Sequence, residues 1–302
     1  MPTTTTFFTR RPVVGLSLIA LLLLLLPSVA ARADEFGVPR LKDNEHFTID
    51  PVVDGVVTVG GISFAELLSL ILSTGEIRPG TPGDPNKLLA IDRVAVTQTV
   101  DPNASRRSDY ALAGAYVYAF LDPLLSGVRD GRRALLVDGI MYAESIAITQ
   151  SFTSATKIGV RRPRPIDYAR CSPEAAPGND CTSTDLELSF FSGHASTAGA
   201  IAGTASYLAF ARNGARSPRP WITLGVGTAL TAFISYERVR AGEHFPTDVI
   251  MGSLAGAAIG VLVPHLHRRP HYHDKELEAP PMWIGFAPLP GDGGAVTLGA
   301  RF

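Results

Sequence analysis

Three short stretches of the chain gather residues suited to binding and transferring an oxyanion. One is Ser192-Gly193-His194, which precedes an apolar run from Thr197 to Ala211 that is typical of a buried helix. The first N–H groups of a helix lack backbone partners and carry part of the helix dipole, so this end can bind an anion. Ser192 can cap the helix or donate its hydroxyl, Gly193 lets the backbone approach closely, and His194 can exchange a proton near neutral pH.

The second stretch is KIGVRRPRP, residues 157–165, which places four cations within eight residues. We interpret Arg161 and Arg162 as a solvated basic turn. Lys157 and Arg164 form a different pair, a point charge and a planar fork, and together they suit an oxyanion with several oxygens. We therefore predict that Lys157 and Arg164 bind the anion.

The third stretch, residues 237–252, contains Arg238, His244 and Asp248. Pro246 starts the last predicted helix and Asp248 lies in its first turn. A carboxylate four residues after an imidazole, across a helix start, can reach back to it. We expect Asp248 to fix one ring nitrogen of His244 as a donor, which leaves the other nitrogen as a nucleophile or ligand. Arg238 adds a third cation.

Taken together, the order and spacing of these stretches resemble the type 2 phosphatidic acid phosphatase (PAP2) superfamily, which also contains bacterial non-specific acid phosphatases and vanadium haloperoxidases. The resemblance covers roughly residues 109–266 and depends on seven polar identities at fixed intervals. The matching residues are Lys157, Arg164 and Pro165, then Ser192, Gly193 and His194, then Arg238, His244 and Asp248.

Two residues depart from the family pattern. Phe191 replaces a proline, and we expect it to shift the loop without removing a chemical group. Glu237 replaces a serine, and its carboxylate would repel phosphate unless it points away or pairs with Arg240 or another cation.

The resemblance implies a metal-independent phosphatase. In such an enzyme His244 attacks phosphorus and forms a phosphohistidine, Asp248 orients His244, and His194 protonates the leaving alkoxide and later activates water. The remaining groups would hold the phosphate oxygens: Lys157, Arg164, Arg238, Ser192 and the backbone N–H of Gly193. We assign no metal site and expect no cofactor, since the sequence contains neither a Walker loop nor a paired-carboxylate metal motif.

Two other functions remain open from the sequence. A vanadate-dependent haloperoxidase would use the same residues to hold vanadate, with His244 as its ligand. A non-catalytic envelope scaffold would need only the bundle. The chain retains all six charged and imidazole groups of the three stretches, and this argues against a scaffold. For a phosphatase, the substrate is a lipid phosphate such as phosphatidate or a polyprenyl diphosphate, or a small soluble phosphomonoester.

Five apolar segments follow Asp109 and are expected to form an all-α helical bundle with the site at its helix ends, because no long alternating strand pattern interrupts them. They are residues 110–127, 133–156, 195–211, 220–236 and 247–266. Residues 34–108 should add one or two helices that pack on this core, including residues 52–72. The tail, residues 267–302, ends in a short hairpin-like segment around GDGG.

Several of these helices are apolar on most faces, which is typical of deep burial or of contact with lipid. Gly252, Gly256 and Gly260 give the last helix a spacing that lets helix backbones approach closely. Asp138 and Glu144 would have to face the interior of a membrane bundle. Membrane association is thus possible, and the sequence favours neither a soluble nor a membrane-embedded bundle.

The N-terminus predicts export. Residues 10–11 are arginines, residues 13–26 contain no charge, and Ala31-Arg32-Ala33 precedes Asp34, so we predict a signal peptide over residues 1–33. The protein is then periplasmic, with a site that faces the periplasm if the bundle is in the membrane. In an oxidising compartment Cys171 and Cys181, the two cysteines of the chain, are expected to pair.

The net charge and a histidine-rich tract bear on nucleic-acid binding and metal binding. With 27 basic and 28 acidic residues the net charge is −1, so no overall field recruits nucleic acid. His265, His267, His271 and His273 lie in the tract PHLHRRPHYHDK. We interpret this tract as a solvated exit from the last helix, because no cluster of carboxylates or cysteines accompanies it at a defined spacing.

Overall fold

The computed structural model of the chain describes residues 41–42, 46–74, 77, 80, 82–170, 188–269, 282–288 and 294–300. The predicted signal peptide (residues 1–33), Cys171, Cys181, His271 and His273 lie outside the described residues. The chain divides into two units, one up to Arg268 and one from Arg269 onward.

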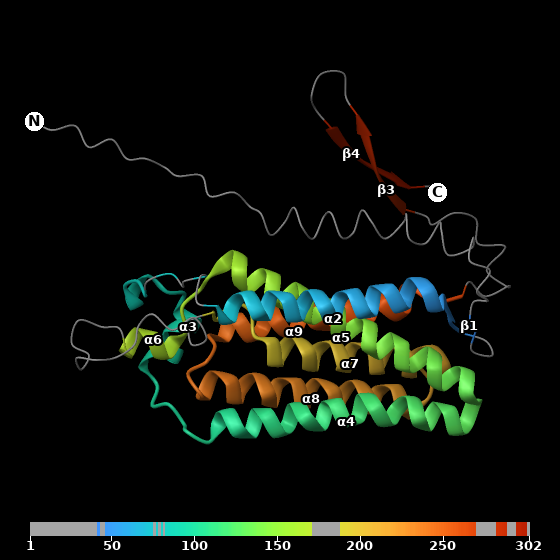
Figure 1. Cartoon of the computed structure of the whole chain (residues 1–302), viewed down its shortest axis with the longest axis horizontal. Helices are drawn as coiled ribbons and strands as arrows, with labels where there is room; N and C mark the ends of the chain where they lie inside the picture. The colour runs from blue at the N-terminus through green and yellow to red at the C-terminus, as the bar shows by residue number, and fades with distance from the viewer. Residues whose placement is uncertain are drawn as a thin grey trace, which may run out of the picture. The chain divides into compact units, whose positions relative to one another are not determined.

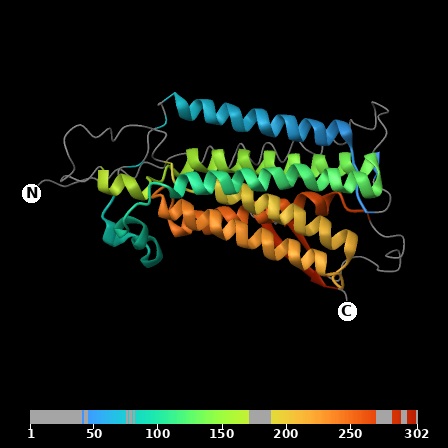
Figure 2. The ribbon, with the colours of Figure 1, turned by 90° about the horizontal axis from the view of Figure 1, so that it is seen from below.

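The first unit is helical, which confirms the all-α prediction. Its long helices are α2 (Pro51–Ser73), α4 (Ala104–Asp130), α5 (Arg132–Val160), α7 (Gly193–Asn213), α8 (Pro218–Arg240) and α9 (Pro246–Leu266). The shorter elements among its described residues are η2 (Pro85–Lys87), α3 (Ala90–Thr97) and α6 (Pro165–Arg170). The long helices lie side by side along one direction, with α3 and α6 near one end of the bundle (Figures 1 and 2).

Local sequence signals set the helix ends. Asp50 caps α2 by accepting from the N–H groups of Val52 and Val53, and Ser217 caps α8 in a similar way. Gly131 adopts a φ of 89° between α4 and α5, where a left-handed backbone favours glycine. This one-residue connection turns the chain back on itself, so α4 and α5 run antiparallel.

Helix α7 is the centre of the bundle and contacts α4, α5, α8 and α9. The predicted glycine row of α9 lies against it: a Cβ at Gly256 or Gly260 would overlap the carbonyl oxygen of Ser196 or Ala200. A Cβ at Gly252 would lie 2.8 Å from the carbonyl oxygen of Ser192. This close packing fixes the N-terminal ends of α7 and α9 next to each other.

The outer faces of the bundle are strongly apolar. Helices α2, α4 and α9 are each long and apolar enough to cross a membrane. Large apolar side chains point outward from α2, α4, α8 and α9, among them Val59, Leu70, Phe120, Val128, Ile222, Val226 and Leu254. So much exposed apolar surface is unusual for a protein surrounded by water and supports membrane association.

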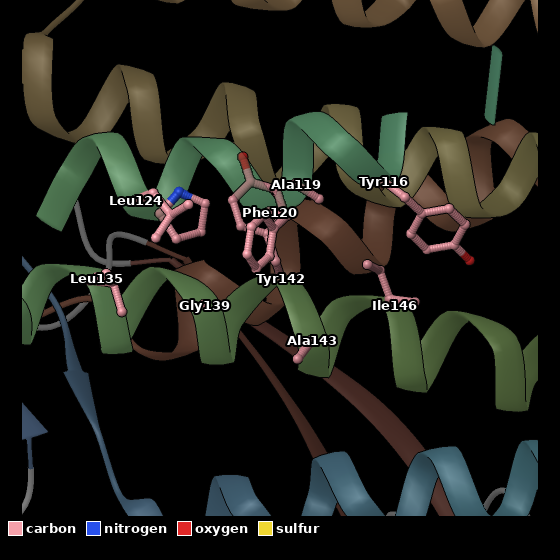
Figure 3. A pocket seen from close by; sticks show the side chains of 10 residues that line it. Tyr116, Ala119, Phe120, Leu124, Leu135, Gly139, Tyr142, Ala143 and Ile146 are labelled. Carbon is pink, nitrogen blue, oxygen red and sulfur yellow. The ribbon is translucent and has the colours of Figure 1, made fainter. Parts of the chain in front are cut away.

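An apolar pocket lies between α4 and α5, part-way along the two helices (Figure 3). Tyr116 and Phe120 from α4 and Tyr142 and Ile146 from α5 are among its lining side chains. None of the predicted site residues lines it.

Two small sheets accompany the helices in the described part of the chain. In the first unit, β1 (Leu41–Lys42) pairs antiparallel with β2 (Thr48–Ile49), and Phe47 bridges to Arg268 just after α9. In the second unit, β3 (Met282–Pro288) pairs antiparallel with β4 (Gly294–Ala300).

Candidate active site

The predicted site residues come from the helix ends at one end of the bundle. Lys157 lies in the last turn of α5, His194 in the first turn of α7, Arg238 in the last turn of α8, and Asp248 in the first turn of α9. This is the end where α3 and α6 lie in Figure 1. Four helix ends thus bring together residues that are up to 91 positions apart in the sequence.

His244 is buried, with 2% of its surface exposed. Its Nδ1 lies 2.7 Å from the carbonyl oxygen of Ser189, an acceptor, so Nδ1 carries the proton and Nε2 keeps a free lone pair. Burial, followed by the positive charges of Arg238, Arg164 and Lys157, holds the pKa of His244 well below its usual range. The imidazole is therefore neutral at physiological pH, as a nucleophile must be.

The expected direct bond between Asp248 and His244 is absent. The nearest oxygen of Asp248 lies 4.0 Å from Nδ1, and the backbone carbonyl of Ser189 takes its place. Asp248 instead accepts from the Ser189 hydroxyl and, at 2.8 Å, from the N–H of Phe245. The carboxylate of Asp248 therefore positions His244 through the two segments that hold it, because its own hydrogen bonds go to Ser189, before α7, and to Phe245, the N-cap of α9.

The interpretation of Arg162 as part of a solvated turn is wrong. Its side chain is 20% exposed and pairs with two fully buried carboxylates, those of Asp92 and Asp248. It also donates to the Thr247 hydroxyl and stacks over the ring of Phe245, 4.0 Å from the ring centre. Arg161 remains at the end of α5, where its Nε donates to a carbonyl three residues back.

Asp92 belongs to α3, in the segment that precedes the core. It accepts from the N–H of Thr247 at 3.0 Å and from the Thr247 hydroxyl at 2.7 Å. This segment therefore packs on the core and, through Asp92, fixes the start of α9 beside His244. The sequence offered no signal for Asp92, since its partners lie 70 or more residues away.

Arg164 and Arg238 lie beside each other, joined by one carboxylate. The Oε2 oxygen of Glu243 accepts from Arg164 and lies 3.4 Å from a terminal nitrogen of Arg238. The Nε atoms of both arginines are buried and have no hydrogen-bond partner among the described residues. Two unpaired guanidinium donors inside a site are suited to an oxyanion, because a buried donor without a partner is costly.

His194 is held by a residue that the sequence analysis did not select. Its Nε2 lies 2.8 Å from Oδ1 of Asp109, whose side chain is 54% exposed. The same oxygen of Asp109 lies 3.9 Å from Arg238. Burial, together with the positive charge of Arg238, lowers the pKa of His194, whereas the bond to Asp109 acts in the opposite direction and favours the protonated ring, a state that can act as a general acid.

Ser192 uses its side chain as the helix cap, accepting from the N–H of Ala195 at 3.4 Å. The hydroxyl still has a proton to donate. Gly193 is the first residue of α7, and apart from Thr153 Cγ2 at 3.7 Å nothing would meet a Cβ there. The amide end of α7 is therefore open to close approach.

Both departures from the family pattern have a structural explanation. Glu237 is buried and pairs with Arg107 of α4 at 2.7 Å, so its charge is neutralised by a cation other than Arg240. Phe191 is buried against the rings of Phe152 and Phe190. The loop before α7 is thus held by aromatic packing instead of a proline.

Comparison with known proteins agrees with this geometry. Residues 138–272 match the family model described as "PAP2 superfamily". The matched segment includes every predicted catalytic and phosphate-binding residue.

The curated relatives are lipid phosphatases by name. Phospholipid phosphatase 1 of Rattus norvegicus is 30% identical over 132 residues, which are 38% of this chain and 46% of that protein. Phospholipid phosphatase 2 of Homo sapiens is 29% identical over 160 residues, 45% of this chain and 55% of that protein. The chain spans about half the length of the curated relatives it matches.

A solved structure is also similar. It is titled as the first transmembrane PAP2 type phosphatidylglycerolphosphate phosphatase from Bacillus subtilis. The similarity covers 70% of this chain and 94% of that one, with a TM-score of 0.42 and 16% sequence identity.

Proposed function

We propose that the chain is a metal-independent phosphatase that hydrolyses lipid phosphates in a membrane through a phosphohistidine on His244. The observation that carries this proposal is a buried, neutral His244 next to two arginines, each with an unpaired buried Nε. A nucleophile beside preorganised cations is the arrangement that phosphoryl transfer needs most, because that reaction depends on positioning and charge stabilisation.

In the first step Nε2 of His244 attacks phosphorus and the bond from phosphorus to the ester oxygen breaks. His194, protonated and held by Asp109, gives its proton to the leaving alkoxide. Lys157, Arg164 and Arg238 stabilise the charge on the equatorial oxygens, together with the Ser192 hydroxyl and the N–H of Gly193. In the second step His194 removes a proton from water, the water oxygen attacks phosphorus, and the phosphorus–nitrogen bond breaks to release phosphate and His244.

A lipid substrate fits the surface of the bundle. The site lies at the helix ends, whereas the sides of α2, α4 and α9 expose apolar side chains. A phosphorylated headgroup would reach the site while its acyl chains stay beside these helices. The names of the curated relatives support the same substrate class, against a small soluble phosphomonoester.

We also propose that the protein is exported and that its site faces the periplasm, on the basis of the predicted signal peptide. In that compartment Cys171 and Cys181 would form a disulfide.

Phosphate release from purified protein tests the proposal. Phosphatidate in detergent micelles and an aryl phosphate are each assayed with EDTA, with and without vanadate. We expect release that resists EDTA, is inhibited by vanadate and is faster with phosphatidate. His244→Ala should abolish it, whereas His265→Ala should not, because His265 is exposed beyond the site and bonds to Tyr207.

Two outcomes would contradict the proposal. Release that EDTA abolishes and a divalent ion restores would assign the chemistry to a metal. Absence of release, with halide oxidation once vanadate and peroxide are supplied, would make the same residues a vanadate site.

A further inference from the structure

Three titratable side chains meet at the end of the bundle opposite to the candidate active site. Asp54 lies in the first turn of α2, Glu144 lies in α5, and His267 directly follows α9. They come from three segments that are 90 and 123 positions apart in the sequence. None of them has a part in the proposed phosphatase reaction.

Their ligand-type atoms converge on one point. Nε2 of His267 lies 3.2 Å from Oδ1 of Asp54 and 3.7 Å from Oε2 of Glu144, and the three atoms lie within 4.8 Å of one another. Two atoms that each lie about 2.1 Å from one tetrahedral ion are about 3.4 Å apart. The measured separations are thus close to those of a metal's ligands.

Glu144 supplies a second, independent observation. The residue is 6% exposed, and its Oε2 has no hydrogen-bond partner among the described residues. A carboxylate oxygen this deeply buried needs compensation, and the partner it faces is the imidazole of His267 at 3.7 Å, too far for a hydrogen bond.

The other atoms of the cluster are already oriented. Nδ1 of His267 donates to the carbonyl oxygen of Val263 at 2.8 Å, so in the neutral ring Nε2 presents its lone pair to the carboxylates. Oδ2 of Asp54 accepts from the N–H of Asp50 at 2.7 Å, which leaves Oδ1 directed at His267. Outer hydrogen bonds of this kind are typical of metal ligands, because they fix the tautomer and the ring orientation.

We propose that Asp54, Glu144 and His267 bind a divalent transition-metal ion, of which zinc is the best fit. One imidazole nitrogen and two carboxylate oxygens are a common donor set for zinc, and the negative charge of the two carboxylates favours a cation. The ion would join the start of α2, the middle of α5 and the end of α9. Its role is structural, since the cluster and the phosphatase site lie at opposite ends of α9.

Within the tract at residues 264–275, interpreted from the sequence as a solvated exit, His265 and Arg268 are exposed but His267 is not. His267 is only 13% exposed, and the carboxylates that the sequence analysis did not find nearby come from α2 and α5.

The test uses the full chain, purified in detergent with a tag other than polyhistidine. The protein is stripped with EDTA, desalted and titrated with ZnCl2, while bound zinc per chain and the melting temperature are measured. We expect one equivalent of zinc and a melting temperature about 5 °C higher at free zinc a hundredfold above Kd. Glu144→Gln, which keeps the shape of the side chain, should weaken zinc binding at least about 100-fold.

Two controls separate this site from other zinc binding. Glu66→Gln changes an exposed carboxylate on α2 and should leave the response to zinc intact. A variant with His265, His271 and His273 changed to Gln tests binding by the rest of the histidine tract.

The proposal fails if zinc does not raise the melting temperature of the wild type, if Glu144→Gln keeps the full response, or if the response disappears with the other three histidines. An imidazolium of His267 held between two carboxylates, with no metal, would give the first of these results. Phosphate release is not a readout here, so either outcome leaves the proposed function untouched.

Discussion

Replacing Arg162 by methionine should destabilise the protein far more than the same change at Arg161. Methionine keeps much of the apolar stem of the side chain and removes the charge. At Arg162 the change leaves the carboxylates of Asp92 and Asp248 buried, each with a side-chain exposure of 0%, and without their cation. At Arg161 it removes one bond to a carbonyl three residues back.

The expected magnitude follows from these contacts. Removing one partner of a buried ion pair costs about 3–5 kcal/mol, because an uncompensated charge stays behind. For a chain of this size such a loss lowers the melting temperature by about 10 °C. Arg161→Met should cost less than about 1 kcal/mol. Since Asp248 positions the segments that hold His244, Arg162→Met should also lower kcat.

Thermal unfolding of the variants in one detergent measures the effect. Adding Asp92→Asn to Arg162→Met should cost less than the sum of the two single changes, by about 1–3 kcal/mol, because the pair is lost only once. Melting temperatures of Arg162→Met and Arg161→Met within about 2 °C of each other would refute the buried network.

Three further predictions concern pH, an internal carboxylate and helix packing. Because the pKa of His244 is lowered, the ring should stay neutral as pH falls, and the acid limb of kcat/KM should lie below pH 6.5 for an aryl phosphate whose own pKa is measured in parallel. Arg164→Gln removes a positive charge and should move this acid limb to higher pH. An acid limb above pH 6.5 in the wild type would contradict the neutral nucleophile. Glu243→Gln removes a carboxylate that occupies guanidinium donors, so inorganic phosphate should inhibit at least about threefold more tightly, and weaker inhibition would show that the carboxylate assists binding. Gly256→Val forces a Cβ onto a carbonyl of α7 and should cost about 2 kcal/mol or more in thermal unfolding, whereas the matched Gly225→Val, which meets no atom within 4 Å, should cost less than about 1 kcal/mol.

The helices were predictable because their signals are local. The predicted segments 195–211 and 247–266 became α7 (Gly193–Asn213) and α9 (Pro246–Leu266), since apolar runs bounded by serine, proline and glycine specify helix and its ends without distant partners. The glycine row of α9 could likewise be interpreted as a packing seam.

The parts of the site that the sequence analysis missed depend on contacts between distant segments. In its sequence context Arg162 does not differ from an exposed arginine in a basic turn, because its partner Asp92 lies on α3, far back in the chain. Asp109 lies 85 residues from the histidine it holds, and the carbonyl of Ser189 carries no side-chain signal for its bond to His244. The same applies to His267, whose carboxylate partners lie on helices far back in the chain.

Trapping the phosphohistidine tests the central claim most directly. The purified protein is mixed with a labelled phosphate ester, quenched in alkali, in which phosphohistidine survives, and digested for mass spectrometry. The account predicts a single phosphorylated histidine at His244, absent in His244→Ala and accumulating in His194→Ala when the ester has a good leaving group. Phosphate release by the wild type without any label on His244, under conditions in which His194→Ala is inactive and unlabelled, would contradict it.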